Sequence, residues 1–407
     1  MSKMNVLILA QYFPPDMGGA STRTYNVAKG LHKKGCNIKV VTGFPHYPHG
    51  KIPKIYQGKA FKMEERKIGE IVRVWLPALP HNKIINRIVL HFCFIFSSLF
   101  ALPFIGEVDV IWAANPNLFS IYPAILYCMF KNAPIIRNVD DLWPESFYIR
   151  GLVKSKILRN ILDFTAWLSY VIPVAITPIS PSYKQRIIEK YNIAKNKIHI
   201  IEVGIDIDEI SQFNKTDNDI FIVMYSGILG VGYDFNCVLK AAKKLEDYKS
   251  IKFVIRGIGE LEHKIRKTIS EYDIKNLELD ANYVSKTKLA QILSSADLFL
   301  LPMSIRSNAD EGLPTKVFEY QAFGKPIICC SQGQSAKYIR STDSGLVVKP
   351  EDHKALAEAI LRLYRDNKSR QRLGKNGAYY VSQNMTSEKI GERMFRVFSE
   401  VICLKMH

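Results

Sequence analysis

The sequence predicts an α/β protein of two doubly wound, Rossmann-like domains. Its 407 residues suffice for two domains, each with its own core. Both halves alternate short apolar runs with helical patterns, as parallel sheets with crossover helices do. A polar stretch separates the halves. We therefore expect a first domain over residues 1–203, a linker over 204–219, a second domain over 220–385 and a C-terminal helix over 386–407.

The first strand–loop–helix unit carries two adjacent glycines. An apolar strand at residues 6–10 precedes a loop with Gly18 and Gly19, and Ser21 or Thr22 is expected to cap the following helix. The Gly-x-Gly-x-x-Gly fingerprint of dinucleotide-binding folds is absent from this loop. The two glycines either form a plain turn or let the backbone approach a ligand closely.

The same alternation predicts the other elements. A hairpin is expected around residues 71–76. The other strands of the first domain are predicted at 37–42, 109–113, 135–138, 174–177 and 198–203, and its other helices at 120–130, 151–172 and 181–191. In the second domain, strands are predicted at 220–225, 251–256, 277–279, 297–302, 327–330 and 345–348, and helices at 235–247, after 260, and at 286–295, 354–365 and 388–404.

Residues 84–105 form a long stretch dominated by Leu, Ile, Phe and Val. Its 22 residues could span a bilayer. We favour a helix buried against the sheet. The second interpretation is a partly exposed helix at a membrane surface. A transmembrane span is least favoured, because it would split the sheet between consecutive strands.

Two acidic residues, Asp140 and Asp141, follow the strand predicted at 135–138. Open α/β sheets bind their ligands at the carboxyl ends of the strands. We expect Asp141 to face a ligand there, whereas Asp140 either does the same or caps the next helix.

A loop and helix at residues 310–327 combine two acids with a cation. Glu311 lies ahead of the helix, which is expected to begin at Thr315, and Glu319 follows eight residues after Glu311. The unpaired N–H groups at the start of a helix suit a phosphate. Lys316 in the first turn is unfavourable for the helix dipole unless an anion lies in front of it. The pattern indicates a ligand such as a sugar nucleotide; the alternative is an ordinary exposed amphipathic helix.

The charge of the chain is strongly positive. The formal net charge is +18, and residues 1–170 hold 21 Lys and Arg against 10 Asp and Glu. Nucleic acid, anionic lipid or a phosphorylated substrate would each explain the excess, but no nucleic-acid-binding motif accompanies it. The seven scattered cysteines favour a reducing compartment over a disulfide framework or a zinc site. We expect a cytoplasmic protein without a secretory signal, since the first apolar run is short.

Three motifs resemble one enzyme family. Glu311-Gly312-Leu313-Pro314 with Glu319 and Gly324-Lys325-Pro326 resembles the paired-glutamate signature of the retaining glycosyltransferases of family 4, which have the GT-B fold. That family also carries a Gly-Gly loop at the place of Gly18 and Gly19. Asp141-Leu142-Trp143-Pro144-Glu145-Ser146 resembles a motif of a branch that builds bacterial surface polysaccharides and includes fucosamine-type transferases.

The resemblance implies two domains that face a cleft, with the last helix crossing back to the first domain. It implies transfer of a sugar with retention from a nucleotide-diphosphate donor, with a UDP-sugar favoured and an N-acetylated amino sugar possible. The acceptor would be a glycan or a polyprenyl-diphosphate-linked molecule. Glu319 would bind the ribose hydroxyls, Glu311 the hydroxyls of the donor sugar, and N–H groups from Gly312 to Thr315 would lie along sugar and phosphate.

The resemblance also distributes the site residues over the two domains. The acceptor side would include Gly18, Gly19 and Asp141, and the catalytic residues would be Glu311, Asp141 and Lys316. The donor would be bound by Gly19, Gly227, Tyr283, Val284, Arg306, Gly312, Leu313, Pro314, Thr315, Lys316 and Glu319.

The sequence departs from the family at two places. Many members hold the diphosphate with an Arg and a Lys after the loop that contains Gly227, but residues 228–235 contain no basic residue. We expect Lys316, or secondly Arg306, to replace them. Val203 stands where an Asn is usual.

No metal and no cofactor are expected, because the acids do not cluster with ligand spacing and Lys316 can carry the charge. The expected partners are the donor, the acceptor and an anionic membrane surface, at the inner face of the cell membrane. Two alternatives remain, a sugar-nucleotide 2-epimerase of the same fold and a non-catalytic partner protein.

Overall fold

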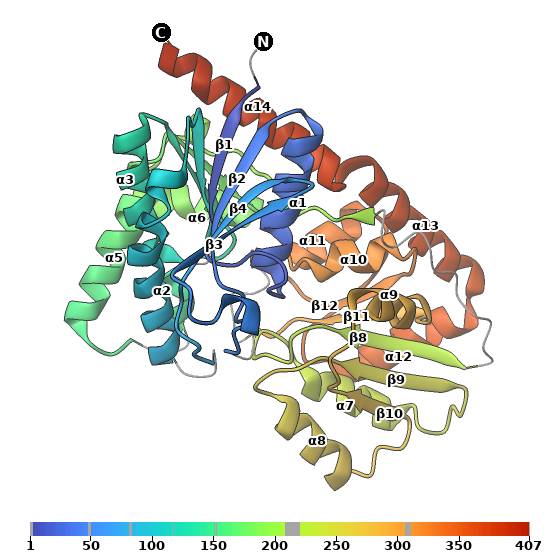
Figure 1. Ribbon diagram of the computed structural model, residues 1–407. Helices are drawn as coiled ribbons and strands as arrows, with labels where there is room; N and C mark the ends of the chain where they lie inside the picture. Colours follow the sequence, from blue (N-terminus) through green and yellow to red (C-terminus); the bar gives the residue numbers. More distant parts are fainter. Residues whose placement is uncertain are drawn as a thin grey trace. The chain divides into compact units, whose positions relative to one another are not determined.

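The computed structural model describes residues 3–47, 50–80, 84–115, 117–149, 151, 153–207, 220–305 and 311–406, with the backbone only at 84, 146, 149, 286 and 406. The chain divides into two units (Figure 1): unit 1 comprises Met1–Gly204 and Ser387–His407, and unit 2 comprises Ile205–Thr386. Each unit contains one sheet with connecting helices, so the predicted α/β class with two Rossmann-like domains is confirmed. Most of the predicted linker lies outside the described residues.

The sheet of unit 1 has, in the described part of the chain, the strand order β3-β4-β2-β1-β5-β6-β7. Its strands are parallel except β3, which pairs antiparallel with β4. The central strands β1 and β5 are apolar except for Asn5 because helices cover both faces of the sheet. The strands are β1 (Asn5–Leu9), β2 (Asn37–Gly43), β3 (Phe61–Arg66), β4 (Gly69–Val74), β5 (Val110–Ala113), β6 (Ile135–Val139) and β7 (Ala175–Pro178).

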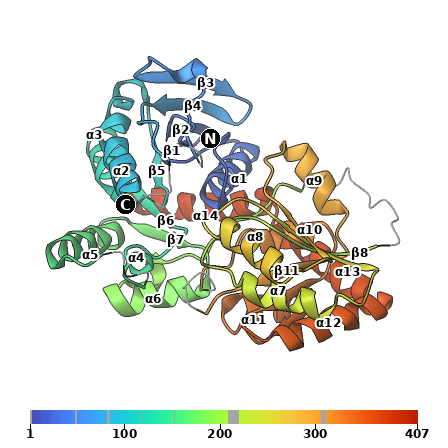
Figure 2. The same cartoon turned by 90° about the horizontal axis from the view of Figure 1, so that it is seen from below.

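Two groups of helices cover this sheet. One face carries α2, α3 and α5, and the other carries α1 with the C-terminal helix α14 (Figure 2). Gly30 of α1 and Gly391 of α14 meet where these helices cross, and a Cβ at either position would overlap the backbone of the other helix. The helices of unit 1 are α1 (Gly19–Lys33), α2 (Ile84–Leu99), α3 (Ile121–Lys131), α4 (Glu145–Ile149), α5 (Lys156–Val171), α6 (Pro181–Tyr191) and α14 (Ser387–Met406).

The sheet of unit 2 has the strand order β10-β9-β8-β11-β12-β13 among the described residues, and every pairing in it is parallel. Its strands are β8 (Phe221–Ser226), β9 (Ile251–Arg256), β10 (Leu277–Asp280), β11 (Leu298–Pro302), β12 (Ile327–Cys330) and β13 (Gly345–Val348). Its helices are α7 (Phe235–Lys244), α8 (Glu262–Glu271), α9 (Lys286–Ser294), α10 (Lys316–Ala322), α11 (Gln334–Ser341), α12 (His353–Arg365) and α13 (Asn367–Asn384).

The stretch at residues 84–105 is only partly what we predicted. It forms α2, which ends at Leu99 and buries Leu90 and Phe94 in the core. The favoured interpretation, a buried helix, is wrong for the outer side, where Phe92 and Phe96 are exposed. Across the described residues, no helix has both the length and the apolar composition needed to cross a membrane.

Three other expectations about local structure were wrong, and two helices were not predicted. The helix α1 starts at Gly19, ahead of the predicted caps, and the hairpin β3–β4 lies earlier than predicted. The strand predicted at 198–203 is absent from the described structure there, since Ile198 makes only an isolated bridge with Ile176. Helices α11 and α13 were not predicted. The α13 sequence has few apolar residues and two glycines, Gly374 and Gly377, that obscure a helical pattern but permit close packing against Gly324 and Gln321 of the same unit.

Candidate functional site

In unit 2, Lys316 lies directly over the loop that follows β8. Gly227 comes after the last residue of this strand and has a φ of +152°. A Cβ at this position would overlap the Nζ of Lys316, so a larger residue here would displace the amine. The structure thus brings together two predicted site residues that are far apart in the sequence.

The amine of Lys316 is buried among aromatic rings. Its Nζ donates a hydrogen bond of 2.6 Å to the Tyr225 hydroxyl and lies 4.3 Å and 4.0 Å from the ring centroids of Tyr225 and Tyr233. The side chain is only 8% exposed. Among the described residues, no carboxylate lies within ion-pair distance of it.

Burial lowers the pKa of Lys316 to about 7, and the charge of Glu319 opposes this shift. An ammonium in such a site is stabilised by ring faces, one hydroxyl and the more distant charge of Glu319, which together do not offset its burial. The arrangement is therefore suited to bind the negative charge of a ligand.

Helix α10 is fixed to the end of β8 by hydrogen bonds of Tyr320. The hydroxyl of Tyr320 donates to the Ser226 carbonyl at 2.8 Å and accepts from the Ser226 N–H at 2.9 Å. Its ring stacks on Phe299 of β11 at a centroid distance of 4.0 Å. These contacts hold Glu319, the half-buried neighbour of Tyr320, at the same edge of the sheet as Lys316.

The segment that precedes α10 has an unusual backbone. Leu313 is buried with a φ of +53°, a left-handed conformation that is uncommon for a bulky residue. Thr315 occupies the cap position as predicted, but its side chain makes no capping hydrogen bond. Gly312 is buried, and Glu311, Pro314 and Thr315 are half-buried. Arg306 lies outside the described residues.

The loop after β10 contains Tyr283 and Val284, two residues predicted to bind the donor. Tyr283 is exposed and Val284 half-buried. Arg256, at the end of β9, forms an ion pair with Asp280 and donates to the Asn282 carbonyl at 2.7 Å. We did not predict this role of Arg256, although a lone Arg that ends an apolar strand was a usable signal.

In unit 1, the two glycines form the start of α1. Gly18 is the cap residue, with a φ of +99°. A Cβ there would lie 3.4 Å from the Tyr47 ring. Asp16 was not predicted, yet its buried carboxylate accepts the N–H groups of His46 and Tyr47 at 2.8 Å each and so fixes this loop.

The two acids after β6 have different environments. Asp141 is half-buried, and its carbonyl accepts the side-chain amide of Asn115 at 3.0 Å. Asp140 lies five residues ahead of α4, so it is not the cap residue of that helix, and it forms an ion pair of 2.8 Å with Arg23 of α1. Burial raises the pKa of Asp140 to about 6, against the effect of Arg23. A buried Arg in the middle of a helix was not recognised from the sequence.

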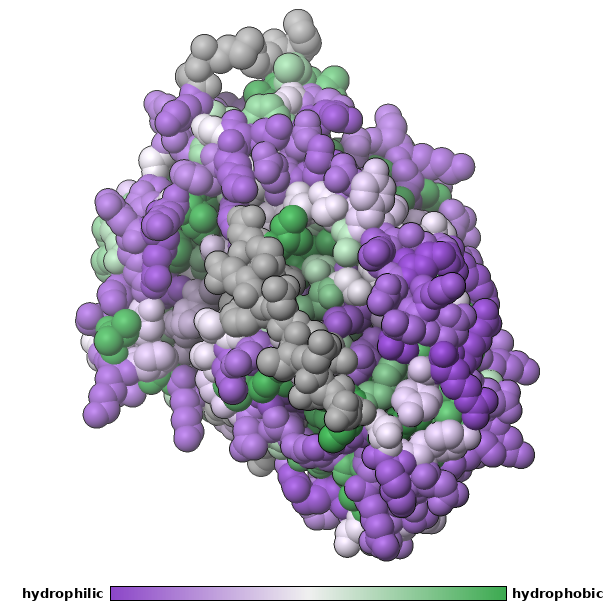
Figure 3. Space-filling view, turned by 90° about the vertical axis from the view of Figure 1, so that its right-hand side faces the viewer, coloured by the Kyte–Doolittle hydropathy of each residue, from purple (hydrophilic) through white to green (hydrophobic). Residues whose placement is uncertain are grey.

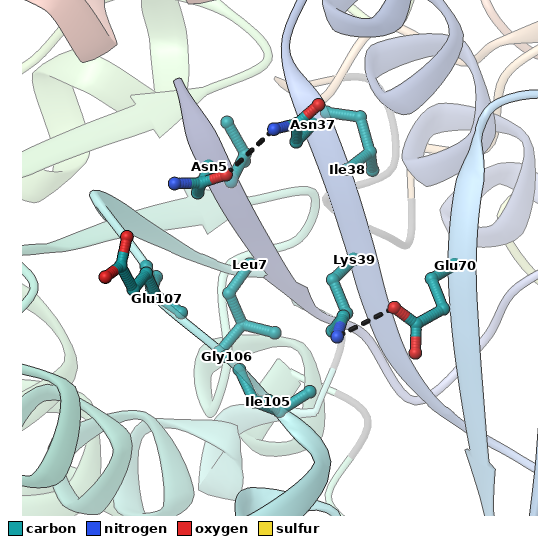
Figure 4. Close-up of a pocket in the computed structure, with 11 residues that line it drawn as sticks. Asn5, Leu7, Asn37, Ile38, Lys39, Glu70, Ile105, Gly106 and Glu107 are labelled. Atoms are coloured by element: carbon teal, nitrogen blue, oxygen red, sulfur yellow. Dashed lines mark hydrogen bonds and ion pairs between the residues drawn. The ribbon is translucent and has the colours of Figure 1, made fainter. Parts of the chain in front are cut away.

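A cavity of about 370 Å³ lies at the opposite edge of the same sheet (Figure 4). It is lined by the amino ends of β1 and β2, and an ion pair of 2.7 Å between Lys39 and Glu70 borders it. Because ligands of open parallel sheets bind at the carboxyl ends of strands, we assign no function to this cavity. No group of His, Cys, Asp and Glu within the described ranges has an arrangement suited to a metal ion.

Comparisons with known proteins cover nearly the whole chain. Residues 17–209 match the family model described as Glycosyltransferase Family 4, and residues 206–379 match the model of Glycosyl transferases group 1. A putative colanic acid biosynthesis glycosyl transferase, WcaI of Escherichia coli (strain K12), is 24% identical over 383 residues, which cover 88% of this chain and 91% of the relative.

Two solved structures are similar throughout. Sucrose-phosphate synthase from Thermosynechococcus elongatus has a TM-score of 0.77 at 15% identity, covering 99% of this chain and 100% of the other. HepE of Anabaena, solved in complex with UDP and glucose, has a TM-score of 0.69 at 15% identity, covering 98% and 100%. At these identities the two structures show the shared fold.

Proposed function

Because the chain is a GT-B glycosyltransferase that joins a glycosyltransferase family 4 domain to a group 1 domain, we propose that it transfers a sugar from a nucleotide-diphosphate donor with retention of configuration. A UDP-sugar is the favoured donor. An N-acetylated amino sugar is compatible with the branch of the family that the Asp141–Ser146 motif resembles. The acceptor is a glycan or a polyprenyl-diphosphate-linked molecule in surface-polysaccharide synthesis, in line with the role in colanic acid biosynthesis that the name of the relative WcaI states.

The observation that carries this proposal is the buried amine of Lys316 beside Gly227. A diphosphate would supply the direct ion-pair partner that the amine lacks among the described residues, where only the more distant charge of Glu319 acts on it. The amine of Lys316 would take the place of the basic residues that many family members carry and that residues 228–235 do not contain. Lys316, once charged, stabilises the leaving diphosphate without a metal.

The remaining roles follow from position along the same motifs. Glu319 binds the ribose hydroxyls, and Glu311 binds the hydroxyls of the donor sugar. Tyr283 and Val284 border the base, and the N–H groups of Gly312–Thr315 lie along sugar and phosphate. Gly18, Gly19 and Asp141 belong to the acceptor side.

In the reaction, the bond between the anomeric carbon and the diphosphate oxygen breaks, and the acceptor oxygen bonds to that carbon on the same face. The acceptor's proton passes to the leaving phosphate. Both the electron pair and the proton therefore end on the diphosphate, whose charge Lys316 balances. We propose that this takes place at the inner face of the cell membrane, with the protein attached peripherally.

Isothermal titration of Lys316→Ala tests the role of the amine. We expect UDP affinity to fall roughly tenfold or more, since a charged hydrogen bond contributes about 1.5–3 kcal/mol. Uridine affinity should hardly change, because uridine has no phosphate. Equal losses for both ligands, or none for either, would remove Lys316 from the diphosphate site, and Arg306→Ala is then the variant to examine.

Proton uptake offers a second readout. With a pKa of about 7 in the free protein, Lys316 is mostly neutral at pH 8. A bound diphosphate raises that pKa, so about one proton should enter with UDP. Calorimetric titrations in two buffers of different ionisation enthalpy measure this proton uptake. The matched variant Lys316→Arg should bind UDP without proton uptake.

Product analysis separates glycosyl transfer from the alternatives. A thermal-shift screen of nucleotide sugars identifies the donor, which is then incubated with and without candidate acceptors. Release of nucleoside diphosphate with a new glycoside supports transfer. Epimerised donor in the absence of acceptor would instead identify a 2-epimerase, and no turnover with any pair would favour a non-catalytic protein.

A further inference from the structure

Three helices on one face of the unit 1 sheet form a single connected surface. In two views, α2, α3 and α5 lie side by side (Figures 1 and 2). The Tyr127 hydroxyl of α3 donates to the Ser98 carbonyl of α2 at 2.7 Å. Tyr122 of α3 and Thr165 of α5 share a hydrogen bond of 2.8 Å. The three helices therefore present their outer sides as one surface.

The outer side of α2 is apolar. Its exposed side chains are Ile85, Val89, Phe92 and Phe96, which recur at helical spacing, and Phe96 is 65% exposed. The inner side, with Leu90 and Phe94, is apolar too. A surface helix of a soluble domain normally turns polar residues to water. Apolar residues on both sides indicate that something other than water covers the outer one.

The neighbouring helices continue this pattern. In α3, Met129 and Phe130 are exposed, the latter to 70%. In α5 the exposed apolar residues again follow helical spacing, beginning with Ile157 at 75%. We call the following exposed residues the apolar face: Ile85, Val89, Phe92, Phe96, Met129, Phe130, Ile157, Ile161, Phe164 and Trp167. Contiguous exposed apolar surfaces of this kind mark sites that contact a protein or a membrane.

The charges around the apolar face favour a membrane. The sequences of α2, α3 and α5 contain Arg87, Lys131, Lys156 and Arg159 against a single acid, Asp163. Exposed Lys154 adds to the positive group at the start of α5. Anionic phospholipid headgroups complement this charge, whereas a second copy of the chain would bring like charges together.

Another side of the molecule provides a contrast. The surface in Figure 3, which includes α13, is mainly hydrophilic, and its hydrophobic residues occur singly or in small groups. The hydrophilic surface in this view contrasts with the apolar face of unit 1. The face includes Trp167, a residue type that is enriched at membrane–water interfaces.

We infer that the apolar face of α2, α3 and α5 docks on an anionic lipid bilayer. Its aliphatic and aromatic side chains enter the boundary between headgroups and acyl chains, and the basic residues around it contact the headgroups. The inference rests on the proposed function, because a polyprenyl-linked acceptor is presented at such a surface. It specifies the part of unit 1 that makes the contact.

Vesicle flotation of the full chain tests the apolar contribution. The vesicles are pure phosphatidylcholine, or phosphatidylcholine with a minor fraction of phosphatidylglycerol. Phe92→Ser with Phe96→Ser should weaken partitioning to the anionic vesicles roughly tenfold or more, since both rings lose their burial in lipid. The matched control is Tyr272→Ser with Tyr379→Ser, which removes two exposed rings from unit 2 and should leave partitioning unchanged.

The same assay tests the charges. Lys156→Gln with Arg159→Gln should weaken binding to anionic vesicles roughly 30-fold at low salt and much less at high salt. Lys267→Gln with Lys375→Gln removes the same charge from unit 2 and serves as the control. Equal binding to neutral and anionic vesicles would overturn the electrostatic part, and equal effects of test and control pairs would overturn the assigned surface.

Quenching by brominated phosphatidylcholine locates the contact. Trp167 fluorescence should be quenched on anionic vesicles, and the quenching should be lost in Trp167→Phe. A concentration-dependent dimer that shields Trp167 without vesicles would overturn the inference in favour of self-association. Titration with UDP is run in parallel: nucleotide binding without vesicle binding contradicts this inference alone, and the reverse result contradicts the proposed function alone.

Discussion

Arg23 in unit 1 and Lys316 in unit 2 are both buried cations on helices, yet their surroundings are opposite. Arg23 pairs with Asp140 at 2.8 Å, donates to Asn138 at 2.7 and 3.0 Å, and donates to the Ile201 carbonyl at 2.7 Å. Lys316 has one hydroxyl and two ring faces.

The difference separates a structural charge from a ligand-binding one. A buried cation whose donors are all satisfied joins elements of the fold, and Arg23 connects α1 to the ends of β6 and β7. A buried cation without a carboxylate partner destabilises the folded protein until an anion arrives. Its presence is then best explained by function.

The largest expected effect is on folding. Arg23→Met leaves the Asp140 carboxylate buried without its partner, and breaking such a pair costs about 3–5 kcal/mol. Urea denaturation measures the loss, and the exposed Arg159→Met serves as the control. If Arg23→Met were as stable as the control, the contrast between the two cations would fail.

Lys316→Met should instead increase the free energy of unfolding. The folded-state pKa of about 7 lies below the ordinary 10.5, so the folded protein bears the cost of a buried ammonium below pH 7. Between pH 7 and 10.5 the amine is neutral in the folded state but protonated in the unfolded state. The free-energy cost of burying the amine therefore decreases progressively as pH rises through this range.

Lys316→Met should therefore be more stable than the parent protein at pH 6. The difference in free energy of unfolding between the two should be smaller by about 2–3 kcal/mol at pH 9. Denaturation at both pH values tests this, with the exposed Lys337→Met as the control. A gain independent of pH would mean that the amine does not change its protonation state in this range.

Glu319→Ala should affect binding of ligand rather than folding. The loss of a charged hydrogen bond to ribose hydroxyls, about 1.5–3 kcal/mol, should weaken UDP and uridine binding alike, by roughly tenfold or more. Calorimetric titration of both ligands distinguishes this pattern from that of Lys316→Ala. Unchanged affinity for uridine would exclude Glu319 from the ribose site.

The smallest effect is expected from Tyr225→Phe. The variant keeps the ring over Lys316 but removes the hydroxyl that accepts from it and donates to the Ile228 carbonyl at 2.7 Å. UDP affinity should fall by about 0.5–1.5 kcal/mol, less than in Lys316→Ala. Tyr248→Phe, which removes a surface hydroxyl bonded to Arg365, is the control. A larger loss than in Lys316→Ala would show that the hydroxyl itself binds ligand.

Local patterns in the sequence predicted most of the fold. The apolar strands and glycine-containing loops depend on residues a few positions apart, so they identified two parallel sheets and most elements correctly. The motif from Glu311 to Glu319 likewise lies within one loop and helix. Helix α13 was not predicted, because Gly374 and Gly377 weaken the local helical pattern. These glycines allow close contacts with residues that are distant in the sequence, such as Gly324.

The sequence by itself determined the fold class, the motifs at Gly18–Gly19 and Glu311–Glu319, and the absence of basic residues after Gly227. Only the tertiary structure decided which cation is paired. The partners of Arg23 and Lys316 come from strands and loops up to 178 and 91 residues away. It also decided that α2 exposes an apolar side, because a helix that is apolar all round carries no periodic signal of which side is buried. Burial and pairing depend on distant residues brought together by folding, whereas sequence patterns report only near neighbours.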